Sequence, residues 1–436
     1  MKKSINIFWL RRDLRIEDNA GLFHALKAGK PVLLLFIFDK EILENLPKQD
    51  ARVTFINNTL QNINKELQSK HNSSIAMYHG KPLEIYKTLE KKYSIDTVFT
   101  NRDYEPYAKD RDSEINTFLE TKNIAFKTFK DHVIFEKEEI VKKDGKPYLV
   151  YTPYMKVWKA TFTKKEVASY DSKSLLNYAL KNANLPNLSL KDIGFAKSTQ
   201  EIKPYNVNAS LIQNYEATRN FPAQDSTSRL GPHLRFGTVS IRNMVRKAIS
   251  EANEIFWQEL IWREFFIQIL WHFPQTITYS FKPQYDRIIW RNNEEEFKRW
   301  CEGKTGYPLV DAGMRQLNKT GFMHNRVRML VGSFLCKHLL IDWRLGEAYF
   351  AEKLHDYEMA SNIGNWQWVA GSGVDAAPYF RIFNPTTQIQ KFDKNLEYIK
   401  KWVPDFQELT YPKPIVDHRE ARERCLTTYK TALNVP

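Results

Sequence analysis

The sequence is poor in cysteine and has no long hydrophobic run. Its three cysteines, Cys301, Cys336 and Cys425, lie far apart without CxxC spacing. A disulfide framework and a zinc site built mainly from cysteine are therefore not expected, and we predict no metal site. The longest apolar run, Val32 to Phe38, is too short to span a bilayer. Two arginines interrupt the first apolar stretch too early for a signal peptide, so we expect a soluble, cytoplasmic protein that does not bind membranes.

Acidic residues are fewer than basic ones. Lys and Arg number 65 against 51 Asp and Glu, which gives a net charge of +14 at pH 7. A basic excess favours polyanionic partners such as nucleic acid. The hydrophobic share of 42% argues against global disorder. Aromatic residues make up 14% of the 436-residue chain and include 11 tryptophans, which suggests a role beyond an ordinary core.

The first 130 residues alternate between strand and helix patterns. Apolar runs predict strands at 5–10, 32–38, 74–78, 97–101 and 124–129, and apolar residues at steps of three and four predict helices such as 52–70 and 82–92. Repeated strand–helix units imply a Rossmann-like α/β domain with a parallel sheet. The loop after the first strand, residues 11–15, lacks a glycine-rich fingerprint, which argues against a standard NAD-type site there.

Strand patterns nearly vanish after residue 205. The stretch from about 169 to 208 is polar and rich in asparagine, which indicates a connecting segment. Helical patterns follow at 254–270, 307–318, 325–340 and 345–355. We therefore expect an α/β domain over residues 1–160, a connector over 161–204 and a mainly α-helical domain over 205–436.

The helix predicted at 254–270 places a carboxylate on an aromatic face. Glu259, Trp262 and Phe266 are spaced i, i+3 and i+7 and so share one side of the helix. One interpretation is a core helix in which Glu259 pairs with Arg263, four residues on. The other is a cavity floor with a polar group placed for a flat, partly polar ligand.

Three further segments each allow two interpretations. Residues 221–232 form either a phosphate-binding loop or a capped helix start. The arginines of segment 323–329 either contact DNA phosphate or form internal ion pairs. Segment 355–358 supplies acceptors for an arginine or a ligand, or is a solvated turn. The tryptophans of the helical half are core residues, or a redox chain if they line up in space.

Taken together, these segments resemble the DNA photolyase/cryptochrome family, and most of all class I cyclobutane pyrimidine dimer photolyases. The motifs are FWLRRDLR (8–15), TSRL (227–230), ELIWREF (259–265), KTGYP (304–308), NWQW (365–368) and APYFRIFNP (377–385). They follow the family order over nearly the whole chain. The resemblance implies an α/β domain that can hold a light-harvesting antenna, and a helical domain that buries a U-shaped FAD.

The resemblance also assigns residues to FAD. Residues matched to its phosphates and ribityl chain are Tyr215, Thr227, Ser228, Arg229, Leu230 and Gly231. Residues matched to the flavin ring are Arg328 and Asp356, as an ion pair, then Tyr357, Glu358 and Asn362. Of these, Asn362 is the residue that faces flavin N5.

The implied activity is light-driven repair of pyrimidine dimers in DNA, by electron transfer from photoexcited reduced FAD to a flipped-out dimer. Residues matched to the lesion and DNA surface are Arg219, Glu259, Trp262, Asn325, Arg326, Met329, Trp368 and Gln388. The matched electron-transfer chain runs through Trp366, Trp343 and Trp290. Glu259 is also implied to stabilise the dimer during the reaction.

Two asparagines favour dimer repair over related activities. The amide carbonyl of Asn362 can accept from N5–H of reduced flavin, whereas plant-type cryptochromes place aspartate there. Asn325 stands where (6-4) photolyases carry a second histidine. Ile363 departs from the family, which usually has asparagine there. The alternatives are a cryptochrome-like flavin photoreceptor without repair activity, and a basic nucleic-acid-binding protein without a cofactor.

The expected partner is UV-damaged DNA, bound by a monomer. Residues 104–109 lack the Asn–Glu pair that marks the known folate antenna site. A second, antenna chromophore would therefore be a deazaflavin, another flavin or a differently bound folate, or it is absent.

Overall fold

The computed structural model describes residues 4–434, and the chain divides into two compact units. Unit 1 contains the residues up to Glu139 together with Ala160–Tyr205 and Arg229–Ser250, and unit 2 contains Ile140–Lys159, Asn206–Ser228 and the residues from Glu251 onwards. The chain thus passes between the units several times. The division into three consecutive domains at residues 160 and 204 stays a prediction.

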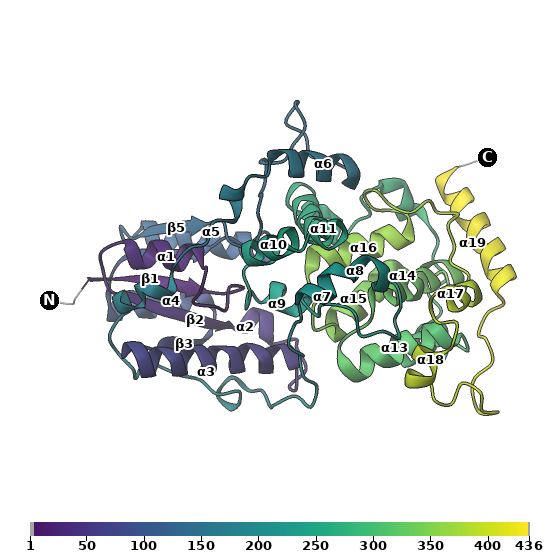
Figure 1. The fold of residues 1–436 in the computed structure, drawn as a ribbon, viewed down its shortest axis with the longest axis horizontal. Coiled ribbons are helices and arrows are strands. Elements are labelled where there is room, and N and C mark those ends of the chain that lie inside the picture. Colours follow the sequence, from purple (N-terminus) through teal and green to yellow (C-terminus); the bar gives the residue numbers. More distant parts are fainter. Residues whose placement is uncertain (1–3, 435–436) are drawn as a thin grey trace. The chain divides into compact units, whose positions relative to one another are not determined.

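Unit 1 is built on a five-stranded parallel sheet (Figure 1). Its strands are β1 (Ser4–Leu10), β2 (Val32–Asp39), β3 (Ile75–Gly80), β4 (Ser94–Asn101) and β5 (Ala125–Phe129). Their order is β3-β2-β1-β4-β5, and every neighbouring pair is parallel. Strand β2 is buried along its whole length, as expected for a sheet covered on both faces.

Helices cover both faces of this sheet. Unit 1 contains α1 (Ala20–Lys27), α2 (Lys40–Leu43), α3 (Ala51–His71), α4 (Pro82–Lys92), α5 (Pro106–Glu120), α9 (Gly231–Arg235) and α10 (Ile241–Ser250). One core cluster joins Phe8 and Leu34 to α1 and α3, and another joins Ile7 and Leu35 to α4 and α5. Alternate residues of each strand therefore face opposite layers, and the predicted α/β domain is confirmed.

The N-terminus of α1 is closed by side chains of unit 1. The amides of Ala20, Gly21 and Leu22 donate to Asp131 Oδ1 (3.0 Å), Asn101 Oδ1 (2.8 Å) and Asn19 Oδ1 (3.1 Å). A helix N-terminus after the first strand is where dinucleotide-binding folds hold a pyrophosphate. Here those three amides already have acceptors, and the sequence has no glycine fingerprint before them.

Unit 2 is mainly helical. Helix α6 (Tyr151–Thr161) belongs to it as far as Lys159. Its other helices are α7 (Ala209–Gln213), α8 (Tyr215–Thr218), α11 (Glu254–His272), α12 (Glu294–Glu302), α13 (Pro308–Thr320), α14 (Asn325–Ser333), α15 (Trp343–Lys353), α16 (Met359–Ala370), α17 (Pro385–Phe392), α18 (Glu397–Trp402) and α19 (His418–Leu433). Helix α16 packs against α11, α14 and α15. The helix expected at 325–340 is corrected: α14 ends at Ser333, and a π-helical turn, Phe334–His338, follows it.

Neither a membrane span nor a metal centre is found between residues 4 and 434. No helix in this range is both long and apolar enough to cross a bilayer. No group of three or more histidine, cysteine or acidic side chains in the same range is arranged to hold a metal ion.

Candidate functional site

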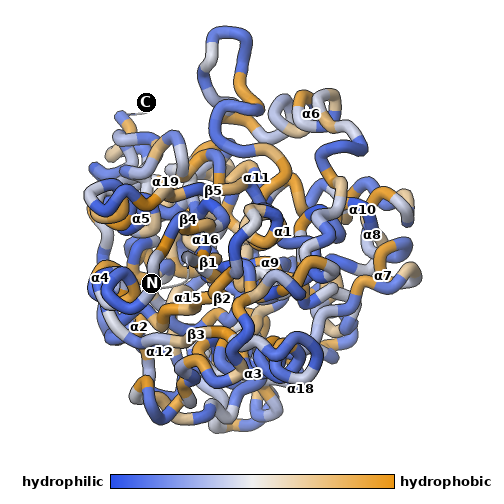
Figure 2. Tube along the Cα trace, turned by 90° about the vertical axis from the view of Figure 1, so that its left-hand side faces the viewer, coloured by the Kyte–Doolittle hydropathy of each residue, from blue (hydrophilic) through white to orange (hydrophobic). Residues whose placement is uncertain are grey.

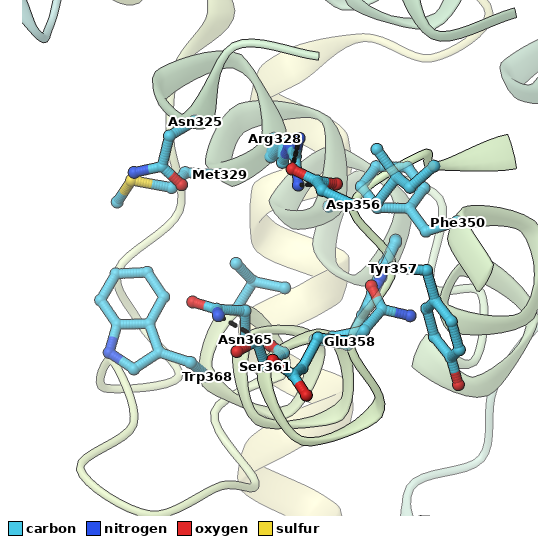
Figure 3. A pocket seen from close by; sticks show the side chains of 15 residues that line it. Asn325, Arg328, Met329, Phe350, Asp356, Tyr357, Glu358, Ser361, Asn365 and Trp368 are labelled. Atoms are coloured by element: carbon cyan, nitrogen blue, oxygen red, sulfur yellow. Dashed lines mark hydrogen bonds and ion pairs between the residues drawn. The ribbon is translucent and has the colours of Figure 1, made fainter. Parts of the chain in front are cut away.

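Unit 2 contains a cavity between α14, α15, α16 and the turn before α16. It is open to solvent at its mouth and encloses about 100 Å³. Its lining residues are Asn325, Arg328, Met329, Gly332, Phe350, Leu354, Asp356, Tyr357, Glu358, Ser361, Asn362, Asn365, Trp366, Trp368 and Val369. Figure 3 shows Asn325, Met329 and Trp368 at one end, and Phe350 and Tyr357 at the other.

A two-pronged ion pair stands in the cavity wall. Arg328 Nη2 lies 2.9 Å from Asp356 Oδ2, and Arg328 Nη1 lies 3.2 Å from Asp356 Oδ1 (Figure 3). Arg328 Nε also donates to the Met323 carbonyl at 2.7 Å, which fixes the guanidinium plane. The interpretation of segment 355–358 as a solvated turn is thus wrong, because Asp356 is the acceptor for an internal arginine. The pair offers a planar ligand charged groups of both signs.

Asn362 enters the cavity with its amide already oriented. Its Nδ2 donates to Glu347 Oε1 at 2.8 Å and to the Glu347 carbonyl at 3.1 Å. Both contacts use the nitrogen, so the amide oxygen remains to accept a hydrogen bond from a ligand. Burial raises the pKa of Glu347, while the Asn362 hydrogen bond opposes this rise. Glu347 on α15 therefore positions a side chain of α16.

The raised pKa of Glu347 predicts a pH-dependent stability difference. Folding favours the protonated carboxyl, so this side chain stabilises the fold below its ordinary pKa of 4.5, and the stabilisation is lost as the pH rises through the raised value. We expect Glu347→Gln, which is neutral throughout, to gain on the order of 1 kcal/mol relative to the natural chain towards neutral pH. Urea unfolding from about pH 4 to about pH 8 measures this difference, and a constant difference would contradict it.

One face of α16 supplies much of the cavity wall. Ser361, Asn365 and Trp368 are spaced i, i+4 and i+7, and all three line the cavity. Trp366 is 3% exposed, and its ring lies against α15 at Gly346, where a Cβ atom would come within 2.2 Å of the indole. The absence of a side chain at Gly346 lets α15 and α16 approach closely enough to hold Trp366 in place.

Ile363 is not part of the lining of this cavity. It lines a separate, smaller space of about 10 Å³ together with Phe266, Ala360 and Gly364. It is 5% exposed and belongs to the main core of unit 2. The isoleucine at this position therefore packs in the core behind α16 and does not line the cavity that Asn362 enters.

The other two tryptophans of the implied relay lie outside the cavity lining. Trp343 is 1% exposed and stands on α15 three residues before Gly346, so it lies on the same side of α15 as the glycine against which Trp366 of α16 packs. Trp290 is half-buried and packs edge-on against Tyr429, with ring centroids 6.2 Å apart. The tryptophan in ring contact with Trp366 is Trp300, at a centroid distance of 6.2 Å. The order of the relay stays a prediction.

The ion pair expected between Glu259 and Arg263 is absent. Glu259 instead pairs with Arg219, from the segment after α8, and Arg263 Nε lies 3.1 Å from Glu358 Oε2. This interpretation failed because tertiary partners outcompete the local i, i+4 spacing. Trp262 stacks on Tyr151, with ring centroids 3.5 Å apart and planes 8° apart. Neither Glu259 nor Trp262 is part of the cavity lining.

Several arginines lie close to one another among the other residues that the family resemblance matches to DNA. Arg326 hydrogen-bonds to Asn220, and its pKa is lowered by burial and by the positive charges of Arg219 and Arg381. Arg381 also lies over the Trp368 ring, 5.9 Å from its centroid. Among the residues matched to DNA, Asn325, Met329 and Trp368 line the cavity, whereas Arg219, Arg326 and Gln388 do not.

The residues matched to the FAD phosphates are not part of the cavity lining. Tyr215 packs edge-on against Phe256 at a centroid distance of 5.2 Å, and Thr227 and Ser228 are half-buried residues of unit 2. Arg229, Leu230 and Gly231 belong to unit 1. Their role stays a prediction from the resemblance, whereas the residues matched to the ring, Arg328, Asp356, Tyr357, Glu358 and Asn362, all line one cavity.

Sequence reasoning missed several residues of the site. Ser361 and Asn365 carried a usable signal, because their helical spacing with Trp368 places them on one face. Glu347, Tyr151 and Trp300 carried none, since their contacts with Asn362, Trp262 and Trp366 join separate segments of the chain.

Comparisons with known proteins agree with this geometry. Residues 256–410, which include the whole cavity lining, match a family described as the FAD binding domain of DNA photolyase, and residues 6–171 match one described as DNA photolyase. The deoxyribodipyrimidine photo-lyase of Agrobacterium fabrum is 36% identical, with 98% of each chain covered. A bacterial class III photolyase structure from Agrobacterium tumefaciens superposes with a TM-score of 0.89 at 32% identity, covering 100% of this chain and 99% of that one. An archaeal photolyase from Sulfolobus tokodaii, solved with two FAD molecules, gives a TM-score of 0.81 at 34% identity and covers 98% and 99%.

Proposed function

The chain belongs to the DNA photolyase family, and on that premise we propose that it is a deoxyribodipyrimidine photo-lyase, which repairs cyclobutane pyrimidine dimers in DNA with light. The observation that carries the proposal is the cavity of unit 2. It brings Arg328, Asp356 and Asn362 together within the matched FAD-binding region. A planar ring with polar edges and apolar faces fits this combination of an ion pair, an oriented amide and aromatic walls.

Residues of this chain hold and orient FAD in the proposal. When bound and reduced, FAD supplies the electron that light drives into the dimer. Arg328 and Asp356 would hold the ring, and the amide oxygen of Asn362, whose nitrogen Glu347 fixes, would accept a hydrogen bond from it. Tyr357 and Glu358 complete the ring contacts. Tyr215, Thr227, Ser228, Arg229, Leu230 and Gly231 hold the phosphates and the ribityl chain.

The substrate side of the proposal rests on the aromatic and charged residues near the cavity. A dimer inside a duplex cannot reach a cavity floor, so it has to leave the base stack, as in other base-flipping enzymes. Trp368 and Trp262 supply flat apolar walls, and the Glu259 carboxylate hydrogen-bonds to the flipped pyrimidines. Arg219, Asn325, Arg326, Met329 and Gln388 form the surrounding DNA surface, where the cations hold phosphates.

Finer assignments extend the same proposal. The sequence motifs favour class I, and because a class III photolyase is among the similar solved structures, class I stays a prediction. The Sulfolobus structure holds a second FAD, which supports an antenna chromophore of flavin type as one choice, beside a deazaflavin or a folate. We further propose a monomeric, cytoplasmic enzyme. Light scattering on the purified protein tests the monomer.

Illuminated repair tests the function directly. Purified protein, reduced in advance, is mixed with an oligonucleotide that carries one thymine dimer, and intact thymines are counted after blue light and after the same time in the dark. The proposal predicts repair in the light only. Bound FAD without repair would favour the cryptochrome-like photoreceptor, and absence of FAD would favour a nucleic-acid-binding protein without a cofactor.

Glu259→Ala is expected to lower the repair yield more than the affinity for damaged DNA. The carboxylate acts on the flipped dimer during the reaction, so its loss should reduce the yield per absorbed photon roughly twofold or more, with dark affinity changed less than about threefold. Glu254→Ala, at the exposed start of the same helix, is the matched control. An unchanged yield in Glu259→Ala would remove this residue from the mechanism.

A further inference from the structure

A basic hairpin precedes α6 and belongs to unit 2. Residues 140–150 turn back on themselves: the Lys142 amide donates to the Lys146 carbonyl at 2.9 Å, and the Gly145 amide to the Lys142 carbonyl at 2.9 Å. Val141 and Pro147 form an antiparallel bridge below the turn. Gly145 adopts a φ of 78°, which only glycine reaches without strain. Figure 1 shows this segment extending beyond α6, and Figure 2 shows that its tube is largely hydrophilic.

Both ends of the hairpin are fixed to helix α11. At the first end, Gln268 Nε2 donates to the Ile140 carbonyl at 2.7 Å. At the second end, Tyr151 stacks on Trp262, and its hydroxyl donates to the Gln258 carbonyl at 2.9 Å. Tyr151 is 5% exposed, so this contact is buried. The turn therefore projects from a firm base on the helix that carries Glu259 and Trp262.

The tip of the hairpin carries positive charge with little compensation. Lys142, Lys143 and Lys146 are all exposed. Lys146 lies 3.7 Å from Asp144, the one acidic residue in the turn. Within residues 4–434, Lys142 and Lys143 form no ion pair. Exposed lysines without internal partners are available to the phosphates of a polyanion.

We infer that this hairpin is a further binding site for the DNA backbone, in which Lys142, Lys143 and Lys146 contact phosphates of the duplex around the lesion. The inference rests on the proposed function, and it adds a contact outside the residues matched to DNA by the family motifs. Here Gln268 and Tyr151 hold the turn on α11, which also supplies the proposed dimer-binding residues.

Salt dependence of binding distinguishes phosphate contact from a solvated turn. Each phosphate neutralised in duplex DNA contributes about −0.9 to the slope of log K against log salt. The triple variant Lys142→Gln, Lys143→Gln, Lys146→Gln should therefore show a slope that is less steep by roughly two to three. Because the contact is to the backbone, undamaged duplex should lose affinity by a similar factor. Fluorescence anisotropy in the dark, at several salt concentrations, gives both values.

Two further variants separate local contact from overall charge. Lys65→Gln, Lys122→Gln, Lys191→Gln removes the same charge from exposed lysines of unit 1 and should leave the slope close to that of the natural chain. Replacement of the three hairpin lysines by arginine should retain the slope, because the charge is kept. An unchanged slope in the hairpin glutamine variant, or an equal change in both glutamine variants, overturns the inference. Failure of the natural chain to bind or repair dimer DNA would instead overturn the proposed function.

Discussion

Trp343→Phe is expected to slow the light-driven reduction of oxidised FAD by roughly tenfold or more. Phenylalanine is much harder to oxidise than tryptophan, so it would interrupt the relay that the family resemblance implies for Trp366, Trp343 and Trp290. Trp343 is buried on α15 in the same core as Trp366 of α16, which lines the cavity. The variant should still repair dimers when it is reduced chemically in advance, because repair uses the cavity and not the relay. Absorption during blue illumination with an external thiol measures the first effect, and dimer counts measure the second.

Trp402→Phe provides the matched control for this result. Trp402 is a half-buried tryptophan of the same core that has no place in the proposed relay. This control should photoreduce at the rate of the natural chain. Survival of photoreduction in Trp343→Phe would contradict the assigned relay and would point to Trp300, whose ring contacts Trp366 directly. Loss of repair by the chemically reduced variant would also contradict the assignment of Trp343 to the relay alone, because Trp343 would then be needed for the cavity itself.

Asp356→Asn is expected to weaken FAD binding about tenfold, which corresponds to about 1.4 kcal/mol. The substitution removes one charge of the pair and leaves Arg328 in the cavity wall, held there by the Met323 carbonyl. The pair is partly exposed, so its loss is smaller than that of a fully buried pair. Titration of the FAD-free variant with FAD, followed by flavin fluorescence, gives the dissociation constant.

Asp405→Asn is a control of closely similar design. The Arg315–Asp405 pair lies in the same unit, and its side chains are 23% and 34% exposed, against 24% and 19% for Arg328 and Asp356. It is not part of the cavity lining. This variant should bind FAD as the natural chain does. Equal weakening in both variants would mean that Asp356 acts on general stability, and the proposed FAD site would lose its central ion pair.

The sequence predicted the elements whose signals are local. Apolar runs located the strands of the parallel sheet, because residues buried on both faces are apolar throughout. Helical spacing located α11, α13 and α15 to within a few residues. The end of α14 was missed, since the π-helical turn at Phe334–His338 keeps the apolar character of the helix before it.

The sequence did not predict ion-pair or hydrogen-bond partners that come from another segment of the chain. The i, i+4 rule pairs Glu259 with Arg263, yet Arg219 and Glu358 are the partners in the fold. Glu347 has no motif of its own, and its role depends on α15 lying beside α16. These are tertiary choices that local spacing does not encode.

The absorption spectrum and cofactor content of the protein purified in the dark test the central claim most directly. The account predicts visible flavin bands and at least one FAD released per chain on denaturation, with both reduced in Asp356→Asn and retained in Asp405→Asn. A colourless protein that also fails to take up added FAD would contradict the account, because the cavity beside Arg328 and Asn362 would then hold something else.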